Sequence, residues 1–482
     1  MSSKKLLEQL LLMAASVLAM IAMWVSPLAN LETGPGLRAL YAVRGTRPAP
    51  QDIVIITMDS ISARELGLRN RPNLWPRSLH AQLIDELRLR SAGVIGVDLL
   101  FDRARDSADD VRLAKSLSLA GNVVLVESVA REAIKSQQGE LLASVDRLVE
   151  PLPQFERAAL ATAPFVLPKT PDGVFAFWSF VPNAGDQPSM PLVLSLSMMP
   201  KEYAELVRAW RAASAGSADR DENGNADSGT SGGPLIQSSS ELTPEAALDS
   251  VPDLLRALRA TFNVDELPSA RVSMRALHVS PRARSLLQLL VAPEPHALNL
   301  YGPIGTIKTI RYRDALSLAA DPVMGERMFK GKAVLIGYSE FNQPEQKDAY
   351  ATPFTTSDGL DISGVELCAT ALANLLDGST LHKPLAGPTW FLLIAFSALL
   401  TLPWWMKRTH YAVLLTLFML FAYGAFACYS FSAHTLWLPV AIPLVLQPSI
   451  VAVLGLSLHV RRAYRKQHEL RQTIRENRIE HK

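Results

Sequence analysis

The chain of 482 residues is long enough for two or three domains, and its formal net charge of +2 provides no strong field toward nucleic acid. Its two cysteines, Cys368 and Cys428, and its nine scattered histidines form neither a disulfide framework nor a metal-binding spacing such as HExxH. We therefore expect no nucleic-acid partner, no metal and no cofactor.

Four apolar runs, each close to the ~20 residues that cross a bilayer, contain no Asp, Glu, Lys or Arg. The predicted transmembrane helices are residues 10–28, 389–406, 411–431 and 436–458. Tryptophans lie near the ends of these runs, where aromatic belts form: Trp390, Trp404, Trp405 and Trp437. The first run follows Lys4 and Lys5 and could be a cleaved signal peptide, but without an evident small-x-small cleavage site we favour an uncleaved anchor.

Basic residues in the short flanks predict the orientation of these helices. Lys407 and Arg408 lie between the second and third runs, and Arg461 and Arg462 follow the fourth, so both places are expected in the cytoplasm. The resulting topology has a cytoplasmic end, a large extracytoplasmic domain and a cytoplasmic basic tail, at residues 1–9, 30–386 and 459–482.

The large domain opens with three apolar, β-branched runs at residues 53–58, 94–101 and 123–126, as in strands buried on both faces of a parallel sheet. Residues 77–91 and 108–120, which lie between these runs, have helical patterns. This alternation predicts right-handed βαβ crossovers and an α/β fold with a mixed, largely parallel sheet flanked by helices.

Acidic residues lie at the ends of the predicted strands: Asp59, Asp98, Asp102 and Glu127. Ligands of open α/β sheets bind beyond the carboxyl ends of the strands, so these residues predict a polar pocket for a cation or a hydroxylated ligand. The alternative is that they cap helices and fix turns, where Asp is common in any case.

The middle of the domain is predicted from spacing and composition. Helices are expected at residues 131–160, 191–213 and 244–291, and a hairpin at residues 163–182 with its turn at 171–173. Ser, Gly, Asp and Asn dominate residues 213–241, which we expect to be a disordered insertion.

The α/β pattern then resumes, with strands predicted at residues 298–301 and 332–338 and a helix at residues 312–318. A further helix is expected to start with a capping box formed by Ser363 and Glu366, and to end at Gly378.

Several of these segments together resemble the CHASE2 domain, an extracellular sensor module of bacterial membrane receptors. The resemblance is carried by residues 53–59, 75–80, 94–101 and 331–337, by Asp348 with Thr352 and Pro353, and by residues 364–366 and 374–376. It covers residues 40–385, and the three apolar runs that follow match the usual layout of the family. The resemblance implies a receptor that senses something outside and controls a cytoplasmic output such as a nucleotide cyclase or a kinase.

We therefore expect a bacterial inner-membrane sensor without catalytic residues, whose external domain binds a ligand or an envelope protein and shifts a conformational equilibrium. The candidate pocket residues are Asp59, Trp75, Arg77, Asp98, Asp102 and Asp348. Arg77 could instead neutralise the acids as a structural ion pair.

The tail from Arg461 to Lys482 carries eight Lys or Arg against three Glu. It could dock on a separate cytoplasmic cyclase or kinase, or lie on anionic membrane lipid, and the receptor could be a homodimer. The alternatives are a structural or assembly protein, the N-terminal sensor part of a longer cyclase or kinase, a transporter and a hydrolase. The charge-free runs argue against a transporter, and the lack of a GxSxG motif or P-loop argues against a hydrolase.

Overall fold

The computed structural model divides the chain into two compact units: residues 46–380 form one, and residues 1–45 with 381–482 form the other. The structure describes residues 3–135, 141–170, 173–221, 250–262, 279–292, 294–340, 346, 348–406 and 408–480. The first unit is an α/β domain, and the second consists of helices.

A seven-stranded sheet forms the centre of the α/β unit, in the order β10-β1-β11-β2-β3-β4, with β5 paired to β3. Its strands are β1 (Ile53–Met58), β2 (Val94–Val97), β3 (Val123–Lys135), β4 (Leu141–Val149), β5 (Ala161–Pro164), β10 (Thr309–Arg311) and β11 (Ala333–Tyr338). All neighbours are parallel except β3 and β4. The later part of the chain therefore places β11 between the two strands that come first in the sequence.

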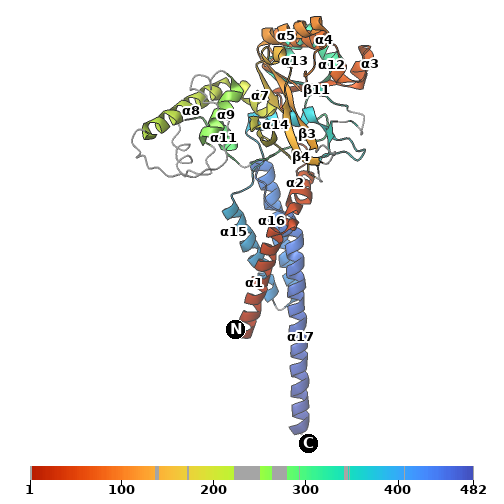
Figure 1. The fold of residues 1–482 in the computed structure, drawn as a ribbon. Coiled ribbons are helices and arrows are strands. Elements are labelled where there is room, and N and C mark those ends of the chain that lie inside the picture. Colours follow the sequence, from red (N-terminus) through yellow and green to blue (C-terminus); the bar gives the residue numbers. More distant parts are fainter. Residues whose placement is uncertain are drawn as a thin grey trace. The chain divides into compact units, whose positions relative to one another are not determined.

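Helices cover both faces of this sheet (Figure 1). One face carries α4 (Arg77–Leu89), α5 (Ser107–Ala120) and α12 (Tyr312–Ala320), and the core beneath them includes Val54 and Ile56. The other face carries α7 (Met190–Ser197) and α14 (Gly364–Asp377), which contact β2 and β11. Strands covered on both faces need apolar residues at every position, which is the pattern that the sequence has.

Two glycines allow α7 and α14 to approach the strands closely. A Cβ on Gly96 of β2 would lie 2.9 Å from Cε of Met190 in α7, and a Cβ on Gly337 of β11 would lie 2.8 Å from Cβ of Val365 in α14. Side chains at these two positions would separate the helices from the sheet, which is why glycine lies in the interior of both strands.

The other elements of this unit are α3 (Ser60–Glu65), η3 (Pro72–Leu74), α6 (Pro153–Glu156), β6 (Ala176–Phe177), β7 (Phe180–Val181), η4 (Pro182–Ala184), β8 (Gln187–Pro188), α8 (Pro200–Asp221), α9 (Val251–Phe262), α11 (Pro281–Leu290), β9 (His296–Ala297), α13 (Pro322–Phe329), β12 (Ala349–Tyr350) and β13 (Ile362–Ser363). The strands among them form three two-stranded sheets: β12 with β13, β6 with β9, and β7 with β8.

The predicted fold class is confirmed, but the helix predicted at residues 131–160 is wrong. There β3 continues to Lys135 and pairs antiparallel with β4, and the helix α6 spans only Pro153–Glu156. Leu141 and Val145 are four positions apart, which suits one face of a helix but also one face of a strand. Pairing with β3, which the local spacing does not encode, decides between the two.

Three smaller predictions also differ from the structure. The hairpin predicted at residues 163–182 is confirmed only around its turn, where Thr170 and Gly173 form an antiparallel bridge. Its predicted strand at β6 pairs with β9 instead, and residues 171–172 lie outside the described residues. The strand predicted at residues 298–301 is instead β9, two residues earlier. Pro200 separates α7 from α8, and α8 continues to Asp221, so residues 213–221 of the predicted insertion are helical, whereas residues 222–241 are not described.

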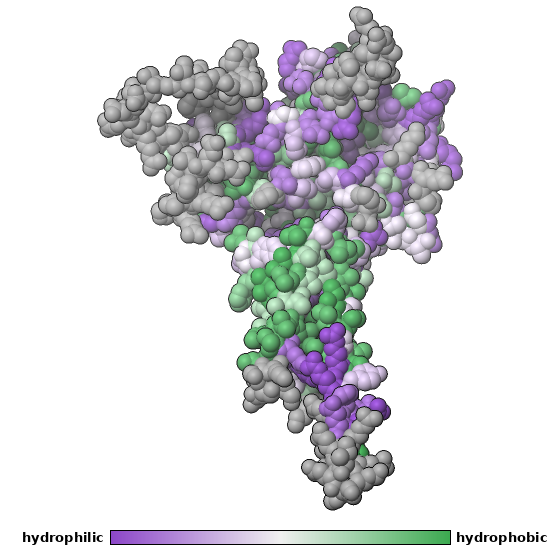
Figure 2. Space-filling view, turned by 60° about the horizontal axis from the view of Figure 1, so that its bottom comes forward, coloured by the Kyte–Doolittle hydropathy of each residue, from purple (hydrophilic) through white to green (hydrophobic). Residues whose placement is uncertain are grey.

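The helical unit contains α1 (Ser3–Val25), η1 (Pro27–Ala29), η2 (Glu32–Gly36), α2 (Leu37–Arg44), α15 (Ala386–Leu399), η6 (Leu402–Trp405), α16 (Thr409–His434), η7 (Ile442–Leu446) and α17 (Gln447–Glu480). Within the described residues, four stretches are long and apolar enough to cross a membrane: Leu6–Val25, Ala386–Trp405, Thr409–His434 and Ile442–Gln472. Figure 2 shows a largely hydrophobic surface over these helices, with hydrophilic residues at one end.

Three of the four candidate spans share a buried polar cluster. The side-chain amide of Gln447 in α17 donates to the Ser16 carbonyl at 2.9 Å, to the Ser16 hydroxyl at 2.7 Å and to the Ser397 hydroxyl at 2.7 Å. Ser16 lies in α1 and Ser397 in α15, and the two hydroxyls are 2.9 Å apart. Polar contacts of this kind link transmembrane helices that have no hydrophobic driving force between them.

Candidate functional site

The carboxyl ends of the parallel strands lie along one edge of the sheet, and polar residues follow them there. Asp59 comes directly after β1, Asp98 directly after β2, and Ser339 and Glu340 directly after β11. Arg311 is the last residue of β10. In open α/β sheets this edge is where ligands bind, so these residues form the first place to look for a site.

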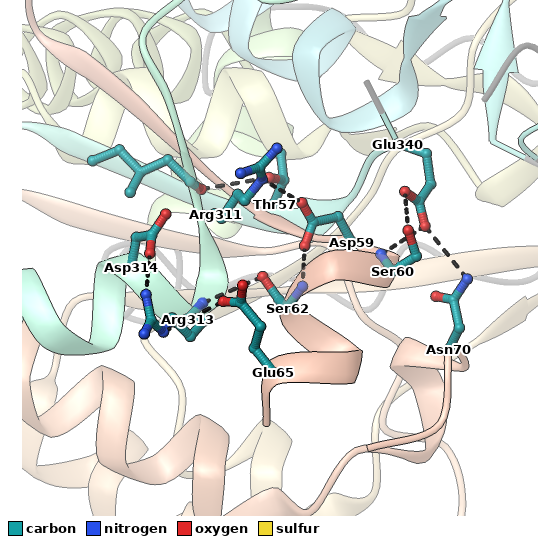
Figure 3. A network of polar contacts seen from close by, with 11 residues as sticks. Thr57, Asp59, Ser60, Ser62, Glu65, Asn70, Arg311, Arg313, Asp314 and Glu340 are labelled. Atoms are coloured by element: carbon teal, nitrogen blue, oxygen red, sulfur yellow. Dashed lines mark hydrogen bonds and ion pairs between the residues drawn. The ribbon is translucent and has the colours of Figure 1, made fainter. Parts of the chain in front are cut away.

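Asp59 links the end of β1 to the end of β10 (Figure 3). Its Oδ1 accepts from the backbone N–H of Ser62 at 2.7 Å, which caps α3, and its Oδ2 accepts from Nε of Arg311 at 3.1 Å. Asp59 is buried, whereas Arg311 is partly exposed. The carboxylate therefore acts both as the helix cap that was one interpretation of the sequence and as the counter-ion of an accessible arginine.

Glu340 forms a second contact across the same edge (Figure 3). Its Oε1 accepts from the backbone N–H of Ser60 at 2.8 Å, and its Oε2 accepts from the Ser60 hydroxyl at 2.9 Å. Asn70 donates a longer hydrogen bond to Oε1, at 3.4 Å. These contacts hold the start of α3 against the end of β11. The sequence analysis missed both Arg311 and Glu340, because strand order, which brings β10 and β11 beside β1, is not visible in the sequence.

A cavity of about 420 Å³ lies beside Arg311. It is lined by β10, by Lys308 just before this strand, and by residues of α12 and α13. The charged residues of the lining are Lys308, Arg311 and Asp314. Arg311 therefore has Asp59 as a partner and an open hollow next to it. An anionic or hydroxylated group could enter there, but Asp59 already neutralises the arginine.

A second polar group brings together two of the predicted pocket residues, Asp98 and Asp348. Burial and then the charge of Asp348 raise the pKa of Asp98 to about 7. Burial also raises the pKa of Asp348, although the Tyr350 hydroxyl and the positive charge of Lys169 oppose this effect. The Lys169 ammonium lies 4.8 Å from the centre of the Tyr350 ring. Two partly buried carboxyl groups that repel each other favour either a shared proton or a bound cation or hydroxyl donor.

The first turn of α14 lies against both of these carboxylate residues. A Cβ on Gly364 would lie 2.4 Å from Oδ2 of Asp348, and a Cβ on Gly337 would lie 3.2 Å from Cβ of Asp98 and 2.8 Å from that of Val365. The backbone N–H of Gly364 donates to the Asp348 carbonyl at 3.2 Å. Asp348 is thus in contact with the first turn of a buried helix, and Asp98 lies next to the glycine against which that turn packs.

Trp75 and Arg77 lie in the helical layer of the core. Arg77 forms an ion pair with Asp110 of α5 at 2.5 Å, and both side chains are at most 5% exposed. The Trp75 ring packs edge-on against Tyr312 at 5.3 Å, and its Nε1 donates to the Arg69 carbonyl at 3.0 Å. Arg77 therefore forms a buried structural ion pair, although with Asp110 and not with the strand-end acids.

Asp102 lies apart from both carboxylate groups. It lies 3.5 Å from Arg103, its neighbour in the chain, and its side chain is 30% exposed. The structure thus separates the six predicted residues into four groups: the Asp98–Asp348 pair, Asp59 with its partner Arg311, the buried Trp75 and Arg77, and the partly exposed Asp102.

A serine, a histidine and a glutamate also meet in the α/β unit, but not as a catalytic relay. Nε2 of His296 lies 3.1 Å from the Ser179 hydroxyl and 3.2 Å from Oε1 of Glu294. In a triad the acid holds the opposite ring nitrogen from the nucleophile, whereas here both contact the same one. Ser179 is also fully buried. Arg259, 3.6 Å from Glu294, makes this cluster a buried ionic network. Among the described residues, no group of three or more His, Cys, Asp or Glu could hold a metal ion.

An α/β domain with a polar strand edge, in a chain whose described part has four candidate membrane-spanning helices, indicates a membrane-associated α/β protein. A family model for the CHASE2 domain matches residues 14–405, well over half of the chain, and the chain belongs to the CHASE2 family. CHASE2 domains are extracytoplasmic sensor domains and are not catalytic. No curated protein and no solved structure matches the chain.

Proposed function

We propose that the chain is a multi-pass receptor of a bacterial inner membrane, whose α/β unit binds a ligand outside and relays the binding to a cytoplasmic output. The observation that carries the proposal is the pair of carboxyl groups, Asp98 and Asp348, at the carboxyl edge of the sheet of a sensor-family domain. A ligand that brings a positive charge or several hydroxyl groups would relieve the repulsion between them.

The path of the relay follows the chain. Asp348 contacts the first turn of α14, which ends at Asp377, and α15 begins at Ala386. A ligand that fits one position of α14 better than another shifts the population of the two positions, and only eight residues connect this helix to the next candidate span. No long flexible linker dissipates the shift.

The orientation rests on the basic residues near the spans. Arg408 precedes α16, and Arg461 and Arg462 follow the apolar part of α17, so these places lie in the cytoplasm and the α/β unit lies outside. α17 continues without a break from the last candidate span into this basic stretch. A continuous helix could present the tail to a separate cyclase or kinase, in a monomer or a homodimer.

Calorimetry on the full chain in lipid nanodiscs tests the ligand site. A panel of small amines, amino sugars and polyols should include one class that binds the wild type with a fixed stoichiometry. Asp98→Asn and Asp348→Asn should weaken that binding by about tenfold or more, because each removes a charged hydrogen-bond acceptor. Asp102→Asn, which removes a partly exposed carboxylate of the loop that carries Asp98, should bind as the wild type does. A folded protein that is silent across the panel, but that co-purifies with a stoichiometric envelope protein, would favour an assembly role.

Protease protection tests the topology. Protease added to intact spheroplasts should cut within the α/β unit and spare the stretch after Arg461. Cleavage after Arg461 with an intact α/β unit would contradict the proposed orientation.

A further inference from the structure

Three connecting segments of the helical unit meet around one cavity of about 430 Å³. They are the segment after α1, the segment before α15, and the segment between α16 and η7. The lining residues that matter here are Trp24, Glu32, Thr33, Lys383, Trp390 and Trp437. Each segment adjoins an end of a candidate span, so the cavity lies at the level where a bilayer has its headgroups.

Hydrogen bonds hold the walls of this cavity in place. Glu32 accepts from three successive backbone N–H groups, those of Val440 at 2.6 Å, Ala441 at 3.0 Å and Ile442 at 2.7 Å. The backbone N–H of Trp437 donates to the His382 carbonyl at 2.9 Å. The cavity is therefore a formed feature of the unit, and the charge of Glu32 is taken up by the start of η7.

Lys383 supplies the positive charge of the cavity. Its ammonium lies 4.4 Å from the centre of the Trp437 ring. Among the described residues, no carboxylate oxygen comes within 4.0 Å of this ammonium, the distance that defines an ion pair. Glu32 is the acidic residue that faces it. A cation held on an aromatic face, without a directly bound counter-ion, is suited to an anion that enters from outside.

The rest of the lining is aromatic and apolar. Trp24 and Trp390 meet edge-on, with ring centres 6.3 Å apart. Their chain neighbours Val25 and Phe391 are 71% and 76% exposed, so apolar surface continues from the cavity onto the outside of the unit. Tryptophans gather at the boundary between headgroups and acyl chains, because their rings are apolar and their N–H groups polar.

We propose that this cavity binds a membrane phospholipid, with the headgroup phosphate at the Lys383 ammonium and the acyl chains along the exposed apolar surface beside Trp24 and Trp390. The proposal is independent of the ligand site at Asp98 and Asp348. It has a consequence for signalling, because Lys383 lies between α14 and α15 in the chain. A bound lipid would fix the segment through which a movement of α14 reaches the candidate span.

Native mass spectrometry of the detergent-solubilised full chain, with phosphatidylglycerol as the probe, tests the proposal. The wild type should retain a bound lipid, and Lys383→Gln should weaken retention by about fivefold or more, the effect of one lost basic contact. Lys383→Arg, which keeps the charge, should retain the lipid. Lys115→Gln, which removes an exposed charge of α5 that does not line the cavity, should behave as the wild type does.

Two further probes separate the lipid from its parts. Diacylglycerol lacks the phosphate and glycerol 3-phosphate lacks the chains, so neither should bind comparably. Equal retention of diacylglycerol, equal binding of glycerol 3-phosphate, or equal loss in Lys383→Gln and Lys115→Gln would overturn the proposal. Thermal unfolding of each variant by circular dichroism confirms that the folded proteins are compared.

Discussion

Both carboxylate oxygens of Glu366 accept a hydrogen bond from the backbone N–H of Gly305, at 3.0 Å each. The N–H of Ile307 lies 3.5 Å from Oε1. Glu366 thus ties the first turn of α14 to the loop before β10, and it takes no part in the predicted capping box. Ser363 makes no side-chain cap, and its buried hydroxyl has no hydrogen-bond partner among the described residues.

This contact predicts a pH-dependent stability. Burial raises the pKa of Glu366 to about 7, although the N–H groups favour the carboxylate. The folded chain keeps a proton that the unfolded chain releases near pH 4.5, so the free energy of unfolding should fall as pH rises from about 4.5 to about 7. The stabilisation that comes from this retained proton is fully present below that pH window and is lost above it. It amounts to at most about 3 kcal/mol. Thermal unfolding of the full chain across the window should show a flatter profile for Glu366→Gln. Glu326→Gln, a change at an exposed carboxylate, should keep the wild-type slope.

The Asp98–Asp348 pair predicts a trade-off between stability and binding. The pKa of Asp98 is also raised, to about 7, so its charge destabilises the folded chain above that pH. Asp98→Asn should therefore raise the free energy of unfolding at about pH 8, by up to about 4 kcal/mol, and change it little below about pH 4. Denaturant unfolding at both pH values measures this. An equal loss of stability at both would show that Asp98 has a packing role instead.

The ion pair of Arg77 and Asp110 predicts a large cost for breaking it. Arg77→Ala should lower the free energy of unfolding by about 3 to 5 kcal/mol, because it leaves the Asp110 carboxylate buried without its partner. Replacing both residues by apolar ones should cost much less than the sum of the two single changes. A double-mutant cycle by urea unfolding checks the coupling, and simple additivity would contradict it.

The Gln447 cluster predicts a modest stabilisation of the helical unit. Gln447→Leu removes the donor to Ser16 and Ser397 and should cost about 0.6 to 2 kcal/mol, the usual range for polar contacts between transmembrane helices. Unfolding in mixed micelles with rising denaturing detergent measures the difference. Gln467→Leu, an exposed position of the same helix, should have no comparable effect.

The sequence was sufficient to predict an element where its pattern of apolar residues fits only one type of secondary structure. Residues 53–58 and 123–126 are apolar at every position, and β1 and β3 include them. The end of α14 was also predictable, because Gly378 has the left-handed conformation (φ 61°) that terminates a helix. The four candidate spans follow from length and composition, as expected.

The rest depends on pairings between distant segments. Glu366 could form a capping box by its spacing, but the loop at Gly305, 61 residues earlier, offers it backbone donors instead. Arg311 and Glu340 reach Asp59 and Ser60 only because β10 and β11 flank β1. Asp98 and Asp348 were both predicted as pocket residues. The sequence around each of them does not indicate that the two carboxylates lie near each other, nor that Arg77 lies elsewhere.

The 34-residue helix α17 carries both the Gln447 cluster and the basic stretch that follows the last candidate span. At 1.5 Å per residue it is roughly 50 Å long, and one unbroken ladder of backbone hydrogen bonds joins its two ends. A small rotation of its first turn, brought about by rearranged hydrogen bonds to Ser16 and Ser397, therefore turns the charges beyond Arg461 by a similar angle. The hydrogen bonds of one buried glutamine amide would then determine which side of the basic stretch faces a neighbouring molecule.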